Sequence, residues 1–311
     1  MNVTRRTFLQ VAGALAGGMA LKTVFDTPKA YANEDFTGHP NRFGMLTDTT
    51  MCTGCRSCER ACNRANRLPP PEKRFADPSV FATERRPTTK AWTVVNQYPS
   101  PILGASPIYR KVQCMHCEEP ACVSACLVGA LKKTPEGAVI YNENLCMGCR
   151  YCMNACPFNV LSFEFDDPFH PAIQKCILCY SRIIKSGGVP ACASACPVQA
   201  NIFGKRSDLL QIARTRINNT PDRYVNQIYG ENEAGGTGWL YLSAVPSEKI
   251  GSPTNLGTQP YPEFTRDWLL GVPVVLIGWP ALLVGLNELS KRRERLALEA
   301  AQRKDKDEEA R

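Results

Sequence analysis

Residues 146–157 read CMGCRYCMNACP, with two, two and three residues between successive cysteines and a proline after the last one. A C-x2-C-x2-C loop can wrap three corners of a cubane, because each iron takes one protein thiolate. The cysteine three residues further on lies in the following helix and points toward a second cubane in two-cluster ferredoxins. This stretch therefore predicts a loop and a short helix that ligate [4Fe-4S] clusters.

All sixteen cysteines fall into four groups of this kind, and each group ends with a C-x3-C step. The first group matches the run to the residue, the second has one gap of four residues, and the fourth has one gap of twelve. The groups are Cys52, Cys55, Cys58, Cys62; Cys114, Cys117, Cys122, Cys126; Cys146, Cys149, Cys152, Cys156; and Cys176, Cys179, Cys192, Cys196. Four thiolates in each of four groups supply the ligands of four [4Fe-4S] clusters.

Three other uses of these cysteines compete with cubanes. Structural zinc also takes paired C-x2-C motifs, but it does not need the C-x3-C tail. Disulfides are common in exported proteins, yet C-x2-C pairs at this density suit a cluster better. One site could also be degenerate or hold a three-iron cluster, although no group lacks a thiolate. Colour separates zinc from cubanes, because cubanes are brown.

The N-terminus resembles a twin-arginine export signal. Residues 4–9 read TRRTFL, an apolar Gly-rich stretch follows, and Ala30-Tyr31-Ala32 offers a cleavage site. An ordinary basic amphipathic terminus is the alternative. Twin-arginine export carries folded proteins, so clusters can be assembled in the reducing cytoplasm first. We therefore expect residues 1–32 to be a signal peptide and the clusters to lie on the periplasmic side of the inner membrane.

Near the C-terminus, residues 268–286 contain no charge and have the length of a membrane span. Pro273 and Pro280 would be awkward in a buried soluble helix, which is the alternative, but membrane helices tolerate them. Several Lys and Arg residues follow and favour a cytoplasmic tail. We expect a transmembrane helix over 267–287 and a charged cytoplasmic tail over 288–311.

Three glycines recur every seven residues within this span and form a stripe: Gly271, Gly278 and Gly285. Small residues allow the backbone of another membrane helix to approach closely. Such a stripe can also arise by chance in a Gly-rich span. The pattern favours contact with an integral membrane partner.

The formal net charge is +8, of which residues 1–32 account for +3. Each oxidised cubane with four thiolates adds about −2, so the loaded protein would be slightly acidic. We therefore interpret the basic residues as partners for clusters and expect no nucleic-acid binding. Those beside ligands could raise cluster potentials: Arg56, Arg60, Arg150 and Lys175.

The three histidines are too few and too scattered for a haem pair or a Rieske site: His39, His116 and His170. His116 lies inside the second cysteine group, so it either donates a hydrogen bond to a cluster sulfur or only packs. No cysteine is spare, which leaves neither a nucleophilic thiol nor an iron without a protein ligand. Both points argue against a catalytic iron-sulfur enzyme.

Between the groups, residues 130–133 and 138–141 flank Pro135-Glu136-Gly137 and predict a short hairpin. Residues 43–47 and 108–112 predict strands that lead into the first two groups. We therefore expect an α+β fold with two ferredoxin-like modules, each holding two clusters, over residues 33–217, with an irregular insertion at 63–113. Residues 218–266 are rich in Gly, Pro, Asn and Thr, and predict a long irregular surface segment.

The chain resembles the four-cluster electron-transfer subunits of membrane-bound respiratory oxidoreductases. It is most similar to the iron-sulfur subunit of periplasmic [NiFe] hydrogenases of the hydrogenase-2 type. The likeness covers residues 1–215 and is carried by QCMHC at 113–117, CRYCM at 149–153 and GGVP at 187–190. It implies a non-catalytic relay between catalytic hydrogenase subunits and an integral quinone-reactive subunit. The alternative is the same relay in a molybdopterin complex of the formate dehydrogenase, polysulfide reductase or sulfoxide reductase type.

The resemblance also implies how the cysteines are shared among four ligand sets, in which the outer groups exchange one ligand and the inner groups exchange another. Set A is Cys52, Cys55, Cys58 and Cys196; set B is Cys176, Cys179, Cys192 and Cys62; set C is Cys114, Cys117, Cys122 and Cys156; set D is Cys146, Cys149, Cys152 and Cys126. Two clusters would then occupy each module.

Overall fold

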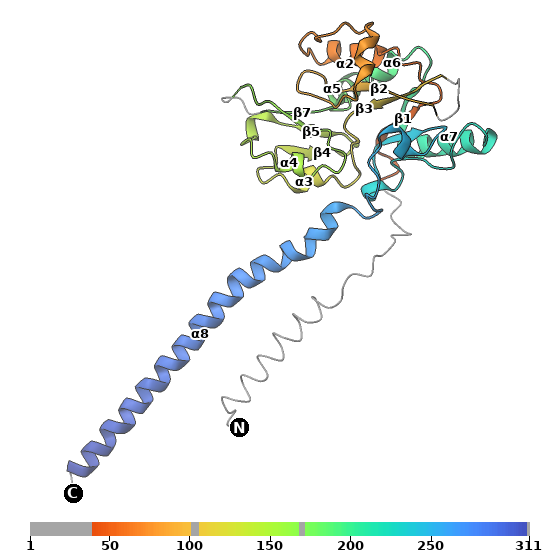
Figure 1. The fold of residues 1–311 in the computed structure, drawn as a ribbon. Coiled ribbons are helices and arrows are strands. Elements are labelled where there is room, and N and C mark those ends of the chain that lie inside the picture. Colours follow the sequence, from red (N-terminus) through yellow and green to blue (C-terminus); the bar gives the residue numbers. More distant parts are fainter. Residues whose placement is uncertain (1–38, 101–105, 168–171, 310–311) are drawn as a thin grey trace. The chain divides into compact units, whose positions relative to one another are not determined.

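The computed structural model describes residues 39–100, 106–167 and 172–309. The chain divides into two compact units, the first ending at Pro260 and the second beginning at Tyr261 (Figure 1). All sixteen cysteines belong to the first unit, which we call the cysteine unit. The expected signal peptide and His170 lie outside the described residues.

The cysteine unit mixes short helices with small sheets, which confirms a mixed helix and strand fold. Its α-helices are α2 (Ser57–Ala65), α3 (Ala121–Ser124), α4 (Tyr151–Asn154), α5 (Tyr180–Ser186), α6 (Ala191–Ser194) and α7 (Arg206–Asn219). Its 3-10 turns are η1 (Pro78–Ala82), η2 (Glu143–Leu145), η3 (Glu233–Gly235) and η4 (Ser247–Ile250). Its strands are β1 (Phe43–Asp48), β2 (Val94–Tyr98), β3 (Ile108–Val112), β4 (Leu131–Lys133), β5 (Val139–Tyr141), β6 (Ser162–Phe163), β7 (Ile173–Gln174), β8 (Asn201–Lys205) and β9 (Trp239–Leu242).

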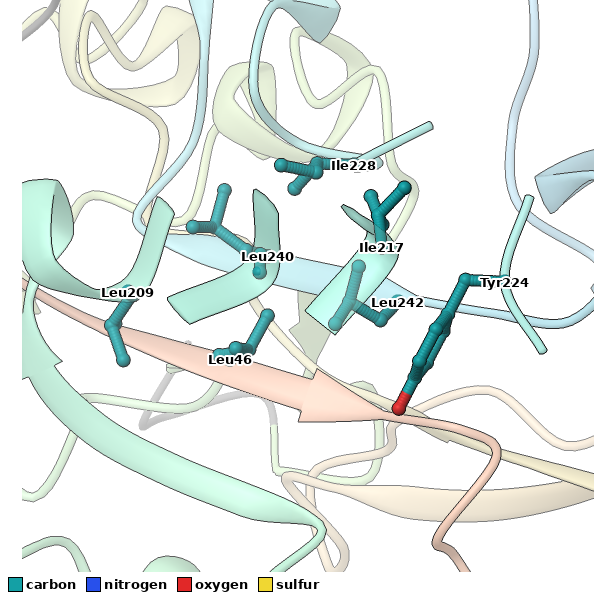
Figure 2. Close-up of a cluster of buried hydrophobic side chains, with 8 residues drawn as sticks. Leu46, Leu209, Ile217, Tyr224, Ile228, Leu240 and Leu242 are labelled. Carbon is teal, nitrogen blue, oxygen red and sulfur yellow. The ribbon is translucent and has the colours of Figure 1, made fainter. Parts of the chain in front are cut away.

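The largest described sheet has the order β8-β1-β9, in which β1 runs antiparallel to β8 and parallel to β9. Helix α7 covers one face of this sheet through Leu209, Ala213 and Ile217, which recur every four residues. Figure 2 shows the leucine and isoleucine of this row meeting Leu46 of β1 and the leucines of β9. This apolar layer packs the strand before the first cysteine group against the part of the chain that follows the fourth cysteine group.

Strand β9 is buried on both faces. Leu240 and Leu242 face α7 (Figure 2), and Trp239 and Tyr241 alternate with them, so they face the opposite side of the sheet. All four side chains are at most 2% exposed. The expectation of an irregular surface segment over 218–266 is therefore wrong for β9. The strand is only four residues long, and the composition of the surrounding loops gives no periodic signal for it. Its partner, β1, lies almost 200 residues away in sequence.

The predicted local elements are confirmed. Strands β4 and β5 form the expected hairpin, and β1 and β3 lead into the first and second cysteine groups. The insertion at 63–113 is less irregular than expected, because β3 pairs with β2 in an antiparallel hairpin. Glu59 of α2 accepts hydrogen bonds from the backbone N–H of Val95 and from Arg85, at 2.6 and 2.7 Å. The insertion is therefore joined to the first cysteine helix.

The helices that carry cysteines pack in two pairs. Helix α2 packs against α6, which joins the first and fourth cysteine groups, and α3 packs against α4, which joins the second and third (Figure 1). Strands β6 and β7 form a short antiparallel ladder in the chain between the third and fourth groups. The outer groups thus lie together, and so do the inner groups.

The second unit is a single helix, α8 (Tyr261–Glu309), with Pro273 and Pro280 inside it. Among the described helices, α8 alone is long and apolar enough to cross a membrane, by length and composition, and its candidate span is Tyr261–Arg303. The helix continues without interruption from the apolar residues into the charged ones. The expected end of the span near residue 287 remains a prediction.

Candidate iron-sulfur centres

The four C-x2-C loops share one backbone feature. In each loop the residue before the second cysteine has a left-handed conformation: Gly54 (φ 70°), His116 (φ 50°), Gly148 (φ 74°) and Leu178 (φ 55°). Two of these four are glycine, which adopts positive φ without strain. In His116 and Leu178 the β-carbon makes this conformation less favourable. The common turn gives all four loops the same local shape, although their sequences and gap lengths differ.

Backbone N–H groups in these loops point at cysteine sulfurs. Gly148 donates to Sγ of Cys146 and Leu178 to Sγ of Cys176, both at 3.4 Å. These hydrogen bonds come from the main chain and do not involve a charged side chain. They supply hydrogen bonds to thiolate sulfur, which is one of the factors that set cluster potentials.

A second turn follows three of the C-x3-C steps. The residue three positions after the last cysteine has positive φ at Gly129, Asn159 and Gln199. At two of these turns the next residue directs its N–H back to the cysteine: Ala130 to Cys126 and Ala200 to Cys196, both at 3.2 Å. The fourth cysteine of these groups is thus held by its own local hydrogen bond.

All sixteen cysteines are free, and the structure brings them together across groups. Burial raises the pKa of Cys62 well above its ordinary value, and the nearby thiols of Cys176, Cys192 and Cys179 raise it further. Burial raises the pKa of Cys52 to about 11, with Cys196 and Cys55 adding to it. The last cysteine of the first group therefore lies among the fourth group, and the last cysteine of the fourth lies beside the first.

The inner groups show the same exchange. Burial raises the pKa of Cys117, and the next largest contribution comes from Cys156, ahead of Cys122 and Cys114 of its own group. Burial raises the pKa of Cys152 to about 11, followed by Cys126 and then by its own neighbours Cys146 and Cys149. A buried thiol with a raised pKa stays protonated until a metal displaces the proton.

One small cavity contains all four cysteines of set B in its lining: Cys62, Cys176, Cys179 and Cys192. Asn66, Lys111 and Trp239 complete part of its wall. A hollow lined by four free thiols, one amide donor and one ammonium fits a cubane in the chemistry of its donors. Sequence reasoning had singled out neither Asn66 nor Lys111, because neither lies beside a ligand in its own cysteine loop.

Neighbouring cysteines also connect one set with the next. Cys58 of set A is close enough to Cys192 of set B to have its pKa raised by it, and Cys114 of set C acts likewise on Cys176 of set B. Cys152 of set D raises the pKa of Cys122 in set C. Burial is the largest cause in each case. Cysteines assigned to neighbouring sets are thus close to one another, A with B, B with C and C with D.

The two most exposed cysteines belong to the first and the last of these sets. Of the sixteen cysteines, Cys55 in set A and Cys149 in set D are exposed, whereas those of sets B and C are buried or half-buried. Exposed apolar side chains lie beside the ligands of set D in sequence: Leu127, Leu145, Met147 and Tyr151.

The basic residues singled out in the sequence have different surroundings. Arg56 is buried and paired with Glu59 at 2.8 Å, so a carboxylate compensates its charge. Arg150 lies over the rings of Phe163 and Phe165. Lys175 is buried and donates to the carbonyl oxygens of Val139 and Cys176.

His116 is buried, and its Nδ1 accepts a hydrogen bond from the N–H of Val139 at 3.0 Å. Burial lowers the pKa of the imidazole well below its ordinary value, and Lys175, Lys133 and Lys111 lower it further. The ring is therefore neutral and carries its proton on Nε2, which has no partner among the described residues. His39, by contrast, lies 3.3 Å from Glu119.

Within the described residues, no three His, Cys, Asp or Glu side chains converge closely enough to hold one metal ion. In a cubane each thiolate binds a different iron, so the sulfurs of a ligand set lie further apart than around a single ion. When bound, a cubane supplies one-electron transfer. The loops, the free thiols and their shared cavity define a ferredoxin-type iron-sulfur protein.

Comparison with known proteins agrees with this class. Residues 106–206 match the 4Fe-4S dicluster domain family. A protein of Nitratidesulfovibrio vulgaris is 47% identical over 295 residues, which is 95% of this chain and 79% of that protein. The hydrogenase-2 operon protein HybA of Escherichia coli O157:H7 is 35% identical over 281 residues, 81% of this chain and 84% of HybA. The nitrate-inducible formate dehydrogenase iron-sulfur subunit of Escherichia coli K12 is 31% identical over 63% of this chain and 66% of that subunit.

The chain belongs to the family of ferredoxin-type iron-sulfur subunits of respiratory oxidoreductases. It carries four [4Fe-4S] clusters and transfers electrons, and it is not a catalytic subunit. The zinc scaffold and the iron-sulfur enzyme are therefore set aside. The predicted cofactor and relay role are confirmed.

Proposed function

We propose that sets A to D, as defined above, are the ligand sets of the four clusters. Three observations support this assignment: the cavity that contains all of set B, the packing of α2 on α6 and of α3 on α4, and the proximity of Cys117 to Cys156 and of Cys152 to Cys126. Sets A and B then form one ferredoxin-like module, and sets C and D form the other.

The observation that best supports a relay through these sets is the proximity of their cysteines, A to B, B to C and C to D. A chain of four sites with exposed cysteines only at its ends, Cys55 and Cys149, leaves one path between two external redox partners. Interrupting any inner site should stop electron flow between those partners. Electron exchange that involves only one of the two partners should persist.

We propose that the partners are the catalytic large and small subunits of a [NiFe] hydrogenase and an integral quinone-reactive membrane subunit, in anaerobic respiration. Similarity to HybA over 84% of its length favours the hydrogenase. The membrane partner is supported by the glycines of α8, because Gly271, Gly278 and Gly285 recur every seven residues within its apolar stretch. Small residues at this spacing let the backbone of a neighbouring membrane helix approach closely.

The test is hydrogen oxidation by the purified complex with two acceptors. Serine at Cys126 or Cys156 should abolish quinone reduction and leave reduction of an artificial dye intact, because the dye takes electrons before the interrupted path. Ser124→Ala is the matched control, since Ser124 is exposed on α3 beside these ligands. Loss of both activities in the cysteine variants would contradict a pure relay role.

A second candidate is the same relay in a molybdopterin complex. Two relatives favour it: the formate dehydrogenase subunit noted above, and a subunit of the anaerobic dimethyl sulfoxide reductase of Haemophilus influenzae. The latter is 35% identical over 54% of this chain and 76% of that subunit. Metal analysis of the purified complex separates the two candidates, because nickel indicates the hydrogenase and molybdenum or tungsten the alternative.

We further propose a periplasmic location, export by the twin-arginine route and anchoring through α8. The supporting features are the TRRTFL segment at residues 4–9 and the apolar length of the helix. Replacing Arg5 and Arg6 by lysine should strand the protein in the cytoplasm. Accessibility to protease in spheroplasts measures export, and unchanged export of that variant would contradict the route.

A further inference from the structure

Lys111 is a buried cation without a carboxylate partner. It lies on β3 and is 1% exposed. Its Nζ donates to Oε1 of Gln113 at 3.0 Å and lies 4.1 Å from the centre of the Trp239 ring. No acidic side chain among the described residues forms an ion pair with it. Burying an ammonium in this way is costly unless another negative group compensates the charge.

The residues around Lys111 hold it in place. Gln113 donates from Nε2 to the hydroxyl of Tyr241 at 2.6 Å, and that hydroxyl donates to the carbonyl oxygen of Lys111 at 2.7 Å. The indole of Trp239 is held by a 2.9 Å hydrogen bond to Thr47. Trp239 and Tyr241 come from β9, the strand that the sequence did not predict. The ammonium is therefore fixed in position rather than free to swing.

A cubane held by the neighbouring cysteines would supply the missing negative charge, because an oxidised cubane with four thiolates carries about −2. Lys111 lines the same small cavity as all four thiols of set B. The ammonium of Lys111 is thus held in the wall of the cavity that the set B thiols line.

We propose that Lys111 is a positioning residue that raises the reduction potential of the cluster held by set B. One-electron reduction adds one negative charge to a cluster, and a fixed positive charge nearby in a poorly screened interior stabilises that reduced form. The effect falls with distance, so it is largest at set B, whose cavity Lys111 lines. This inference rests on the proposed ligand set B. It assigns the positive charge that acts on the set B cluster to Lys111.

The test is a redox titration of the full-length, anaerobically purified protein, followed by electron paramagnetic resonance. Lys111→Met should lower the midpoint potential of one signal most, that of a second signal less, and leave the others unchanged, with the iron content retained. Lys111→Arg should restore the potential at least in part. Lys132→Met is the matched control, because it removes the same charge from an exposed position on β4 and should shift nothing.

The signal of set B is identified independently of Lys111, as the one changed by both Cys62→Ser and Cys179→Ser. If these two variants change different signals, ligand set B is wrong, whatever Lys111 does. If they agree but Lys111→Met leaves that signal at its original potential, or shifts another signal more, the inference about Lys111 fails while the relay stands. If Lys111→Met does not load iron, Lys111→Arg decides the question. Recovered iron content supports a requirement for a positive charge at this position, and iron content that is not recovered overturns the inference about Lys111.

Discussion

The side-chain amide of Asn66 donates a hydrogen bond to the sulfur of Cys62, with 3.4 Å between Nδ2 and Sγ. At Cys126 and Cys196 the corresponding donor is a backbone N–H four residues later. The backbone of the first group has no such turn, because α2 continues past Cys62 to Ala65. A side chain therefore replaces a main-chain donor at this one position.

We expect Asn66→Ala to lower the potential of the cluster ligated by Cys62. If the hydrogen bond is about 1 kcal/mol stronger to the reduced cluster than to the oxidised one, it raises the potential of a one-electron couple by about 40 mV. Redox titration with spectroscopic detection measures the shift. Asn63→Ala is the control, because Asn63 lies near the end of α2, close to Asn66, but donates to the carbonyl of Pro69. An equal shift in both variants would mean that the helix, and not the hydrogen bond, is responsible.

Cys62→Ser should disturb the cluster held by Cys176, Cys179 and Cys192 and leave the one held by Cys52, Cys55 and Cys58 largely intact. The reason is that Cys62 lines the same cavity as the three fourth-group thiols. Spectra of the variant compared with those of Cys55→Ser would show which signal each substitution removes. The same signal lost in both variants would reverse the assignment of sets A and B.

The apolar layer between α7 and the sheet should depend strongly on β9. Leu240→Ala removes a fully buried side chain, and such truncations cost about 2–5 kcal/mol. Denaturant unfolding of the loaded protein should therefore show a clearly lower midpoint. Ile212→Ala on the exposed side of α7 should change stability by no more than about 0.5 kcal/mol. Comparable losses in the two variants would argue against β9 as a core strand.

Ending the chain at Pro260 should release the protein from the membrane fraction, because this truncation removes all of α8 and leaves the cysteine unit complete. The measurement is the distribution of the protein between soluble and membrane fractions in cells that lack the membrane partner. Iron content serves as the control for intact folding. A truncated protein that stays membrane-bound under these conditions would refute the anchoring role of α8.

Much of the cysteine unit follows from short-range pattern. The C-x2-C spacing predicts the loops, the turn at Pro135-Glu136-Gly137 predicts the β4–β5 hairpin, and the strand before each of the first two groups is where the sequence indicates. These features are determined by residues within a few positions of one another. Strand β9 has no clear sequence signal because it is four residues long, follows a Gly-rich loop and is stabilised by a distant partner, β1.

The sequence by itself determined the number and identity of the thiolates, and hence the cofactor, because ligand spacing is a local covalent property. It could not determine which thiolates face one cavity, in what order the sets follow, or that Lys111 lies beside set B against Trp239. Those relationships join residues from 52 to 239, and depend on how helices and strands far apart in the chain pack together. Burial and the proximity of charges arise only from that packing, so the tertiary structure decided the electrostatic surroundings that distinguish four chemically identical sets of ligands.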